Sequence, residues 1–597
     1  MLKTTPLFFC CLLLMGTQRA EAAFWSFGQL KPETTQQNKP NPCDQWQRGP
    51  AFALERLSTP HTSTTHQQKI TLALIQDQIH QGCADNVDDL LRYLPQTGLS
   101  AHQKTEVRLW TAIRDNQESH PKQAKKLLSQ IPKRPAFTSE FVESWLTERL
   151  SANRQLGQVS ATIDALYQWS LEKPEVWQDP AFTQQFWQTL LLLPEPQLKQ
   201  GSKDKTLSAW FTLAGLSKKY PADWSGLQQW RQKHAAHPAH AWLGAVTTRK
   251  PVHSIGIMLP LTGPHRDAAQ TILDGILSGY YQTPIGQRPR LVIRNTAEKK
   301  CEVVYADLIT EGVERIIGPL SKDELKRCAY ALKRSTVPTL ALNHIDETMP
   351  AHIQSLTLSP DTEIEGLVRQ LRQNNRHRIV VLYTPDPLGM RLSKALEDRL
   401  SATDIQWVRH AQVTKGSELN STLAELLGVK EQQKRHLRIQ GFIKKNLNTE
   451  FDPLAEADAL VVFTKADLTL QLRPHLNYHH AQSLPIYILS TALSTLDPVK
   501  LVQEKDHETL YYSHLPLMMH MSDPHIESSL KSSWPEEYER APQFLALGAD
   551  AYLQSTQGEW FQQFSGLGFP ALTAWLTQDE HGIHRDLPWR NTAPADN

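Results

Sequence analysis

The chain changes its hydrophobic pattern at Ser254, and residues 254–281 show the change in one stretch. Residues 254–259 (SIGIML) form an uninterrupted apolar run of strand length. Residues 260–264 (PLTGP) cannot continue a strand, because each of the two prolines lacks a backbone N–H donor. From Arg266 onward the apolar residues recur at helical spacing. The stretch therefore predicts a buried strand, a tight turn and a helix, which is the opening unit of an α/β sheet.

Strand and helix patterns alternate after this unit, in two successive sets. Strands are expected at residues 290–294, 315–318, 338–342 and 353–358, then at 378–383, 406–411, 457–463 and 485–489. Helices are expected at residues 299–310, 320–334 and 361–373, then at 388–400, 419–427 and 466–476. A further helix at 543–554 and a β-hairpin at 571–589, turning at 579–582, complete the pattern. Such alternation predicts parallel sheets with right-handed crossovers, arranged here as two lobes with a cleft between them.

Residues 66–240 instead show a helical period throughout, broken by short X-Pro steps. Short connections between helices predict antiparallel pairs, and a run of pairs predicts an all-α solenoid of tetratricopeptide-like form. Seven of the tryptophans in this region permit two interpretations: they wedge between stacked helices, or they line a concave surface that grips a partner. They are Trp145, Trp169, Trp177, Trp187, Trp210, Trp224 and Trp230.

The first residues have the features of a secretory signal. Lys3 is followed by an apolar segment at 7–15 that is too short to span a bilayer, and 20–22 (AEA) is a small-x-small cleavage site. We therefore expect a periplasmic protein, exported through a cleavable signal peptide. Lipoprotein processing at Cys10 or Cys11 is the alternative, but it requires a small residue before the cysteine, where Phe9 and Cys10 stand.

Four cysteines remain once the signal is removed. Four cysteines allow three pairings, and an even number in an oxidising compartment indicates disulfides. Proximity within a domain favours Cys43–Cys83 and Cys301–Cys328, with free buried cysteines as the alternative. Neither pair has the Cys-x-x-Cys spacing of a zinc or redox site.

Composition and motifs exclude several function classes. Lys and Arg number 63 against 62 Asp and Glu, a balance that argues against a nucleic-acid partner. The mature chain holds no Gly-x-Ser-x-Gly, His-Glu-x-x-His or Walker-type glycine loop. His234, His237 and His240 are spaced by three, but Pro238 interrupts them and no carboxylate or cysteine joins them, so we expect a polar interdomain linker rather than a metal site. We expect no enzyme activity, no metal and no cofactor.

Turns at the carboxyl ends of predicted strands supply the candidate ligand residues. Ligands of open α/β sheets bind at such ends through backbone N–H groups and hydroxyls. The candidates are Thr262, Gly263, Gly318 and Ser321 in the first lobe and Tyr383 and Asp386 in the second. The alternative is architectural: the turns close the fold, Asp386 caps a helix, and Tyr383 is a core aromatic.

Residues 254–281 (SIGIMLPLTGPHRDAAQTILDGILSGYY), followed in order by several other blocks, resemble the penicillin-binding protein activator family of LpoA (LppC) type. The other blocks are 315–320 (RIIGPL), 337–343 (VPTLALN), 358–361 (LSPD), 380–389 (VVLYTPDPLG), 457–474 (ADALVVFTKADLTLQLRP), 484–491 (LPIYILST), 544–552 (FLALGADAY) and the end of 572–589 (HRDLPW). The resemblance implies a helical tetratricopeptide-like N-terminal domain and a C-terminal module of periplasmic-binding-protein type I form. It also implies a non-enzymatic periplasmic regulator that binds a class A bifunctional penicillin-binding protein and stimulates its transpeptidase function, with peptidoglycan as a further possible contact. A periplasmic receptor that closes its lobes on a small molecule is the alternative function.

Two departures from the family pattern concern location and charge. Family members are typically outer-membrane lipoproteins, whereas the lipobox is not convincing here, which leaves outer-membrane association open. Residues 452–456 (DPLAE) stand where the family usually has an arginine cluster. A basic segment lies upstream and is either a solvated helix face or a contact for an acidic partner or anionic wall polymer. Its residues are Lys434, Arg435, Arg438, Lys444 and Lys445.

The domain organisation that we expect follows from these patterns. It comprises a signal peptide at 1–22, an extended tether at 23–65, a helical domain at 66–240, a linker at 241–251 and a two-lobed α/β module at 252–597. Lobe one is expected at about 252–375 together with the returning C-terminal segments, and lobe two at about 376–510.

Overall fold

The computed structural model describes most of the chain from residue 64 onward. The described residues are 64–80, 84–95, 97–117, 120–132, 138–244, 251–345, 347–429, 434, 438–439, 457–493, 510–564, 566–579 and 582–591. The expected signal peptide, nearly all of the tether and most of the linker lie outside these residues, as do Cys43 and Cys83.

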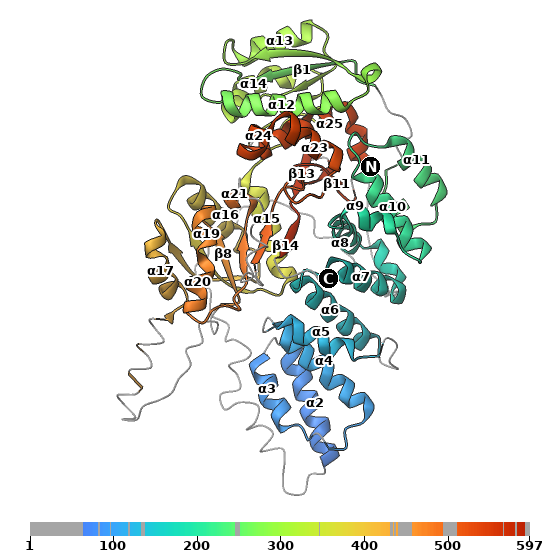
Figure 1. Ribbon diagram of the computed structural model, residues 1–597, viewed down its shortest axis with the longest axis vertical. Coiled ribbons are helices and arrows are strands. Elements are labelled where there is room, and N and C mark those ends of the chain that lie inside the picture. The colour runs from blue at the N-terminus through green and yellow to red at the C-terminus, as the bar shows by residue number, and fades with distance from the viewer. Residues whose placement is uncertain are drawn as a thin grey trace, which may run out of the picture.

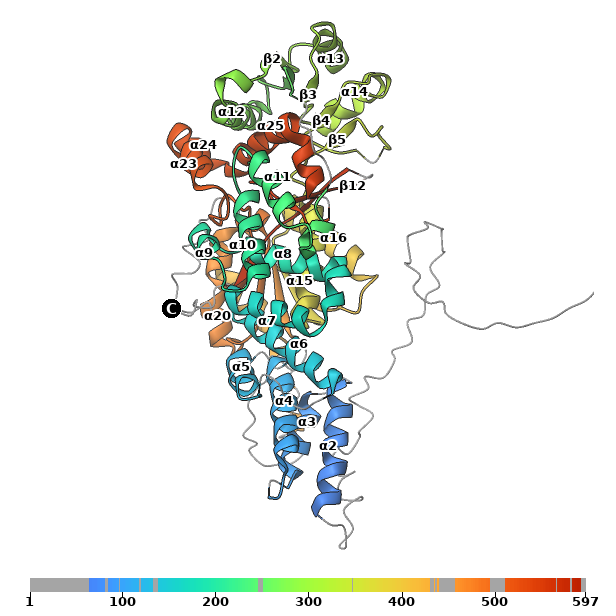
Figure 2. The ribbon, with the colours of Figure 1, turned by 90° about the vertical axis from the view of Figure 1, so that its right-hand side faces the viewer.

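Helices make up the described residues before β1. Several begin at a side-chain cap: Asp179 accepts from the Ala181 N–H at 2.9 Å and Asp204 from the Leu207 N–H at 2.9 Å, which satisfies donors that the first turn leaves free. Successive helices pack on one another down the length of the molecule (Figure 2). They are α2 (Thr64–His80), α3 (Ala84–Tyr93), α4 (Ala101–Gln117), α5 (Pro121–Ser129), α6 (Ser139–Gln155), α7 (Val159–Glu172), α8 (Pro180–Leu191), α9 (Glu195–Gln200), α10 (Lys205–Ser217) and α11 (Trp224–Lys233).

The tryptophans of this region are core residues. Trp187 and Trp210 are fully buried, and Trp145 and Trp230 are nearly so. Trp169, Trp177 and Trp224 are partly buried and pack against the same cores. The structure therefore supports the interpretation in which tryptophans wedge between helices.

The histidine segment at 234–240 differs from the expected polar linker. The His237 ring lies 5.0 Å from the Trp210 ring and 5.2 Å from the Trp230 ring, and its Nε2 is 2.9 Å from the Thr206 carbonyl. Burial lowers the pKa of His237 to about 4. A desolvated imidazole is neutral and can pack among aromatic rings as part of the core. The spacing of the histidines in the sequence did not reveal this role.

Lobe one is a parallel sheet in the order β2-β1-β3-β4-β5, with helices on both faces (Figure 1). All six residues of β1 are buried, as a strand covered on two faces requires. Its strands are β1 (Ser254–Leu259), β2 (Arg290–Asn295), β3 (Arg315–Ile317), β4 (Thr339–Ala341) and β5 (Ile353–Ser355). Its helices are α12 (Arg266–Gln282), α13 (Cys301–Thr310) and α14 (Lys322–Arg334).

Lobe two is a sheet in the order β14-β10-β9-β8-β6-β7, parallel except for the pair β10–β14. Its strands are β6 (Arg378–Tyr383), β7 (Gln406–Gln412), β8 (Ala459–Phe463), β9 (Ile486–Ile488), β10 (Leu510–Ser513) and β14 (Trp589–Asn591). Its helices are α15 (Pro360–Gln373), α16 (Pro387–Leu400), α17 (Leu419–Leu426), α19 (Ala466–Leu470), α20 (Leu472–Tyr478) and α21 (Ser490–Leu493). The expected boundary at about 375 had placed α15 in lobe one, but α15 packs on α16 and shares an apolar core with β6.

The returning C-terminal segment serves both lobes. It forms α23 (Pro524–Ser533), α24 (Pro535–Arg540), α25 (Pro542–Gln563) and a small antiparallel sheet of β11 (Phe569–Pro570), β12 (Trp575–Asp579) and β13 (Gly582–Asp586). Helix α25 packs along α12, and β14 then joins lobe two (Figure 1). The sequence assigned these returning segments to lobe one only.

Local boundaries differ from the expected ones in three further places. The helix expected at 466–476 is two helices broken at Gln471, because Pro474 fits only the first turn of a new helix. The expected hairpin at 571–589 is the shorter pair β12–β13, since Trp589 belongs to β14. Helix α25 runs well past Gln554, with a non-helical residue at Gln557.

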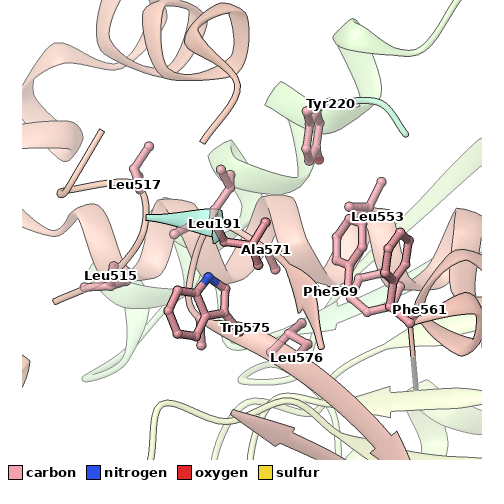
Figure 3. Packing of buried hydrophobic residues seen from close by; sticks show 14 of the residues in the cluster. Leu191, Tyr220, Leu515, Leu517, Leu553, Phe561, Phe569, Ala571, Trp575 and Leu576 are labelled. Atoms are coloured by element: carbon pink, nitrogen blue, oxygen red, sulfur yellow. The ribbon is translucent and has the colours of Figure 1, made fainter. Parts of the chain in front are cut away.

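The apolar cores divide at a different place from the sequence pattern. One core joins α2–α6, from Ile75 to Ala152. A second core begins at Leu150 and runs without a break through α7–α11 into lobe one and the C-terminal segment. Figure 3 shows part of it, in which Leu191 and Tyr220 lie among C-terminal residues such as Phe569 and Trp575. Residues 150–243 therefore share one core with the α/β module.

Cys301 and Cys328 form a disulfide with a Cα–Cα distance of 5.6 Å. It ties the first residue of α13 to α14 on one face of the lobe-one sheet. Both cysteines are buried in the core under these helices. Disulfides of this kind persist in oxidising compartments.

Two glycines allow the backbones of α12 and α25 to touch. A Cβ on Gly548 would lie 2.0 Å from the Ile272 carbonyl oxygen, and one on Gly275 would lie 2.1 Å from that of Leu545. We predict that Gly548→Ala forces the helices apart and lowers the free energy of unfolding by about 1–3 kcal/mol. Chemical unfolding followed by tryptophan fluorescence measures this change.

Gly215→Ala is the matched control, because it lies in α10 and nothing stands within 4 Å of an added Cβ. It should stabilise the helix by about 0.5–1 kcal/mol. Equal effects of the two substitutions would contradict the close approach of α12 and α25.

Candidate functional site

The lobe-one cleft candidates lie at the carboxyl edge of its sheet, where they hold the turns together. The Thr262 hydroxyl accepts a hydrogen bond from Asn295 Nδ2 at 3.0 Å, and the Asn295 side-chain oxygen accepts from the Leu261 N–H at 2.9 Å. Gly263 has a φ of +80°, which a glycine adopts without strain. The turn after β1 is thus tied to the end of β2.

Gly318 and Ser321 shape the turn between β3 and α14. A Cβ on Gly318 would lie 2.1 Å from the Met258 carbonyl oxygen, and its φ is +109°. Ser321 caps α14 in a capping box: its hydroxyl accepts from the Glu324 N–H at 3.2 Å, and Glu324 accepts from the Ser321 N–H at 3.3 Å. Both residues are required by the geometry of this turn.

The lobe-two candidates have comparable structural partners. Asp386 caps α16, where it accepts from the Gly389 N–H and from the Thr384 hydroxyl, each at 2.8 Å. These hydrogen bonds lower the pKa of Asp386, the Gly389 N–H most of all. Tyr383 is buried, and its hydroxyl accepts from Gln412 Nε2 at 2.9 Å.

The structure thus gives every polar side chain among the cleft candidates a hydrogen-bond partner within its own lobe. It places them on two different sheets, at the two carboxyl edges. An arrangement already satisfied in this way can support the fold without a ligand.

A buried charged cluster, which the sequence did not reveal, joins the lobes. Arg585 of β13 donates from Nη1 to the Thr357 carbonyl at 3.1 Å and from Nη2 to the Thr573 carbonyl at 3.0 Å. Its charge acts on two buried carboxylates, Glu363 of α15 and Asp550 of α25. We call Arg585, Glu363 and Asp550 the lobe-junction cluster.

The two carboxylates of this cluster hold loops of different lobes. Asp550 accepts from the N–H groups of Leu572 and Thr573 at 2.9 and 2.8 Å, and from the Thr573 hydroxyl at 2.7 Å. Glu363 accepts from the Ser490 hydroxyl at 2.9 Å, at the start of α21. Burial raises the pKa of both carboxyls, that of Asp550 to about 6, and lowers the pKa of Arg585. The sequence holds one local sign of this cluster: Asp550 is a single carboxylate inside the apolar run 544–552.

The end of α6 docks on lobe two through buried polar groups. Gln155 Oε1 accepts from Arg376 Nη2 at 3.2 Å, and the Gln155 carbonyl accepts from the Tyr511 hydroxyl at 3.3 Å. Asn591 Nδ2 of β14 donates to the carbonyls of Arg154 and Gln155. The helical region therefore contacts lobe two as well as lobe one.

Two basic side chains, the buried Lys218 and the partly buried Arg590, close the end of α8. Lys218 Nζ donates to the Leu193 carbonyl at 2.8 Å, and Arg590 Nη2 of β14 donates to the Leu192 carbonyl at 3.1 Å. Positive charge is favourable at a helix C-terminus, where carbonyls lack intrahelical partners. Burial, and next to it the Arg590 charge, lowers the pKa of Lys218 to about 7.

The basic segment is only partly described. Lys434 and Arg438 are helical and exposed, whereas Arg435, Lys444 and Lys445 lie outside the described residues. No group of three or more His, Cys, Asp or Glu side chains within the described part of the chain could hold a metal ion. No described helix has both the length and the apolar character needed to cross a membrane.

Comparison with known proteins gives matches over most of the chain. The family model described as "LppC putative lipoprotein" matches residues 51–593. Penicillin-binding protein activator LpoA of Vibrio vulnificus (strain YJ016) is 24% identical over 467 residues, which are 74% of this chain and 75% of that protein. The protein of the same name from Vibrio antiquarius (strain Ex25) is 22% identical over 419 residues, 66% of this chain and 67% of that protein. The solved full-length LpoA from Haemophilus influenzae aligns with 91% of this chain and 96% of its own, at 17% identity and a TM-score of 0.43.

Lys218 should make stability depend on pH in the alkaline range. Its pKa is about 7 in the folded protein and 10.5 in an unperturbed lysine, so between these values the unfolded chain binds more protons. The free energy of unfolding should therefore rise with pH above 7, by at most about 1.4 kcal/mol per pH unit for one group. Lys218→Met should remove this rise, as urea unfolding between pH 7 and 9.5 would show.

Lys219→Met is the control, because Lys219 is the exposed neighbour. It should leave the rise unchanged. A rise of the same size in Lys218→Met would show that another group causes it.

Arg585→Met tests the lobe-junction cluster. The substitution leaves Asp550 and Glu363 buried without their positive partner, so we predict a loss of about 3–5 kcal/mol in the free energy of unfolding at pH 8. The loss should shrink at pH 5, which lies below the pKa of about 6 of Asp550, because that carboxyl then binds a proton and is no longer an unpaired buried charge. Arg290→Met, on the exposed end of β2, should change stability by less than about 0.5 kcal/mol at either pH. A loss independent of pH would contradict a charge-based role.

Proposed function

Because the chain belongs to the LppC lipoprotein family, we propose that it is a non-enzymatic activator of a class A bifunctional penicillin-binding protein. Two curated relatives carry the name penicillin-binding protein activator, and the matched region spans about three quarters of the first and two thirds of the second. The activity raised would be the transpeptidase function, and the process would be peptidoglycan synthesis. Neither enzyme activity nor a cofactor of its own is part of the proposal.

The observation that carries the proposal is that the polar side chains among the cleft candidates already have hydrogen-bond partners in the protein. Thr262, Ser321, Tyr383 and Asp386 are each hydrogen-bonded within their own lobe. A receptor needs polar groups that converge on a ligand. Partnered groups at these strand ends support an α/β module that acts through its outer surface, and so favour an activator over a solute receptor.

The rigidity of the junctions supports a mechanism by selective binding. A ligand shifts an equilibrium only by the difference in its affinity for the two states. The shared core, the lobe-junction cluster and the α6 contact with lobe two hold the surfaces of this protein in fixed relation. A rigid surface loses little conformational entropy on binding, so it can discriminate between an active and an inactive synthase.

We further propose that the helical region is a tetratricopeptide-like domain that provides reach. Helices α2–α5 extend away from both lobes in Figure 1 and have a core of their own with α6. The proposed location is the periplasm, after cleavage of the signal at 1–22, with outer-membrane association if Cys10 or Cys11 is lipidated instead. Mass spectrometry of the mature N-terminus distinguishes a free Ala23 from a lipidated cysteine.

The basic segment is the proposed contact on the α/β module. Lys434 and Arg438 are exposed there, and an acidic face of the synthase, or anionic wall polymer, would complement them. Charges at the rim of an interface act mainly on the association rate and on its salt dependence.

The test is a cross-linking assay with the class A synthase from the same cells. We predict that the purified chain binds this synthase and increases the cross-linked fraction of its peptidoglycan product. The double substitution Lys434→Glu and Arg438→Glu should weaken binding by about tenfold, or about 1.4 kcal/mol, and reduce its salt dependence. Lys203→Glu with Lys205→Glu, exposed on the helical region, is the matched control and should bind like the unaltered chain. Absence of both binding and stimulation by the unaltered chain would overturn the proposed function.

A further inference from the structure

A cavity of about 250 Å³ lies at the amino edge of the lobe-one sheet, the opposite edge from the cleft candidates. Its floor comes from residues at the starts of β3, β4 and β5, among them Arg315, His352 and Gln354. Its other wall comes from α25 and β12, which contribute Gln554, Ser555 and Gln578. We call it the α25 cavity.

The polar side chains around the α25 cavity are incompletely satisfied. Gln554 is only 7% exposed, and its Nε2 donates to Gln354 Oε1 at 3.2 Å. Its own Oε1 is buried without a hydrogen-bond partner among the described residues, and so is Gln578 Oε1. Buried acceptors are normally paired, and an unpaired one destabilises the protein that holds it. Two of them at one cavity indicate a place for N–H donors.

Helix α25 is interrupted beside the same cavity. Gln557 has φ −137° and ψ 36°, outside the helical range. Gln554, Ser555, Thr556 and Gln557 are four successive polar residues that are all buried. A helix that only filled a core would carry apolar residues there. The interruption and the polar run both set this turn of α25 apart from the rest of the helix.

Arg315 supplies a positive charge at the cavity. It lies half-buried at the start of β3, and its Nη1 donates to the neighbouring Glu314 carbonyl at 3.0 Å. A guanidinium presents several N–H donors in a plane and binds carboxylates well. The cavity thus combines a site for a carboxylate with two acceptors for N–H groups.

We propose that the α25 cavity binds a small carboxylate that also carries N–H donors, of the size of an amino acid or a dipeptide. Its volume is below that of pockets for drug-sized ligands, which are about 300–1,000 Å³. The proposal is independent of the proposed function, because the cavity is separate from both the cleft candidates and the basic segment. It requires no closure of the lobes.

Thermal unfolding and calorimetric titration of the full chain with alanylalanine test the proposal. Propionate, which has only the carboxylate, and alaninamide, which has only the N–H donors, are the partial probes. Alanylalanine should raise the unfolding midpoint by a few degrees in a saturable way, because a ligand of the native state stabilises it. Propionate and alaninamide should each bind at least tenfold more weakly than alanylalanine.

Two variants assign the effect to the cavity. Gln554→Leu removes a buried unpartnered oxygen but also the hydrogen bond that Nε2 donates to Gln354, so its unfolding midpoint without ligand should change little. It should lose at least tenfold in affinity for alanylalanine. Arg315→Gln, at a half-exposed position, should bind alanylalanine no better than alaninamide. Gln270→Leu, on the exposed side of α12, is the control and should bind normally. The proposal is overturned if the unaltered chain does not respond to alanylalanine. It is also overturned if Arg315→Gln binds alanylalanine as well as the unaltered chain does. Both outcomes can be measured even if Gln554→Leu fails to fold.

Discussion

The apolar contact between α8 and the C-terminal segment is the interaction on which the rest of the structure depends. Trp187 is fully buried, stacks on Phe564 at a ring distance of 5.8 Å, and donates from Nε1 to the Gly568 carbonyl at 2.8 Å. Helices of the length of α7–α11 gain most of their stability from packing an apolar face. Here that face packs on α25 and its sheet, so this half of the helical region and lobe one form a single folded unit.

Polar contacts then fix lobe two against this unit. Arg376 and Asn591 attach it to the end of α6, and Arg585 connects the carboxylates of Glu363 and Asp550. Buried charges and amides cost free energy unless they are paired, so they tolerate only a narrow range of lobe positions. A solute receptor benefits from lobes that move, whereas a regulator that distinguishes two states of a partner benefits from lobes that do not.

Much of the fold could be predicted from local patterns. The apolar runs predicted the buried strands β1, β6 and β8, because a strand buried on both faces must be continuously apolar. Strand β10, which also lies in the parallel part of the lobe-two sheet, was not predicted. The architectural alternative for Asp386, a helix cap, could be stated because Asp-Pro is a local start signal. The lobe-junction cluster could not be predicted, because Glu363, Asp550 and Arg585 are far apart in the chain. Only Asp550, inside an apolar run, differs in its local sequence from an ordinary surface charge. Gln554 and Gln578 could not be identified in advance either, because their unpaired oxygens exist only in the folded protein.

The sequence by itself determined most of the elements, the two α/β sets and the family, because periodicity and ordered motifs are properties of neighbouring residues. Only the tertiary structure decided where one folding unit ends and the next begins. The pattern changes at Ser254, but the apolar cores change within α6, since burial depends on which faces meet in space. It also decided that the turn at Thr262 and Gly263 braces β1 against β2, and that an unpaired polar cavity lies at the other edge of the same sheet.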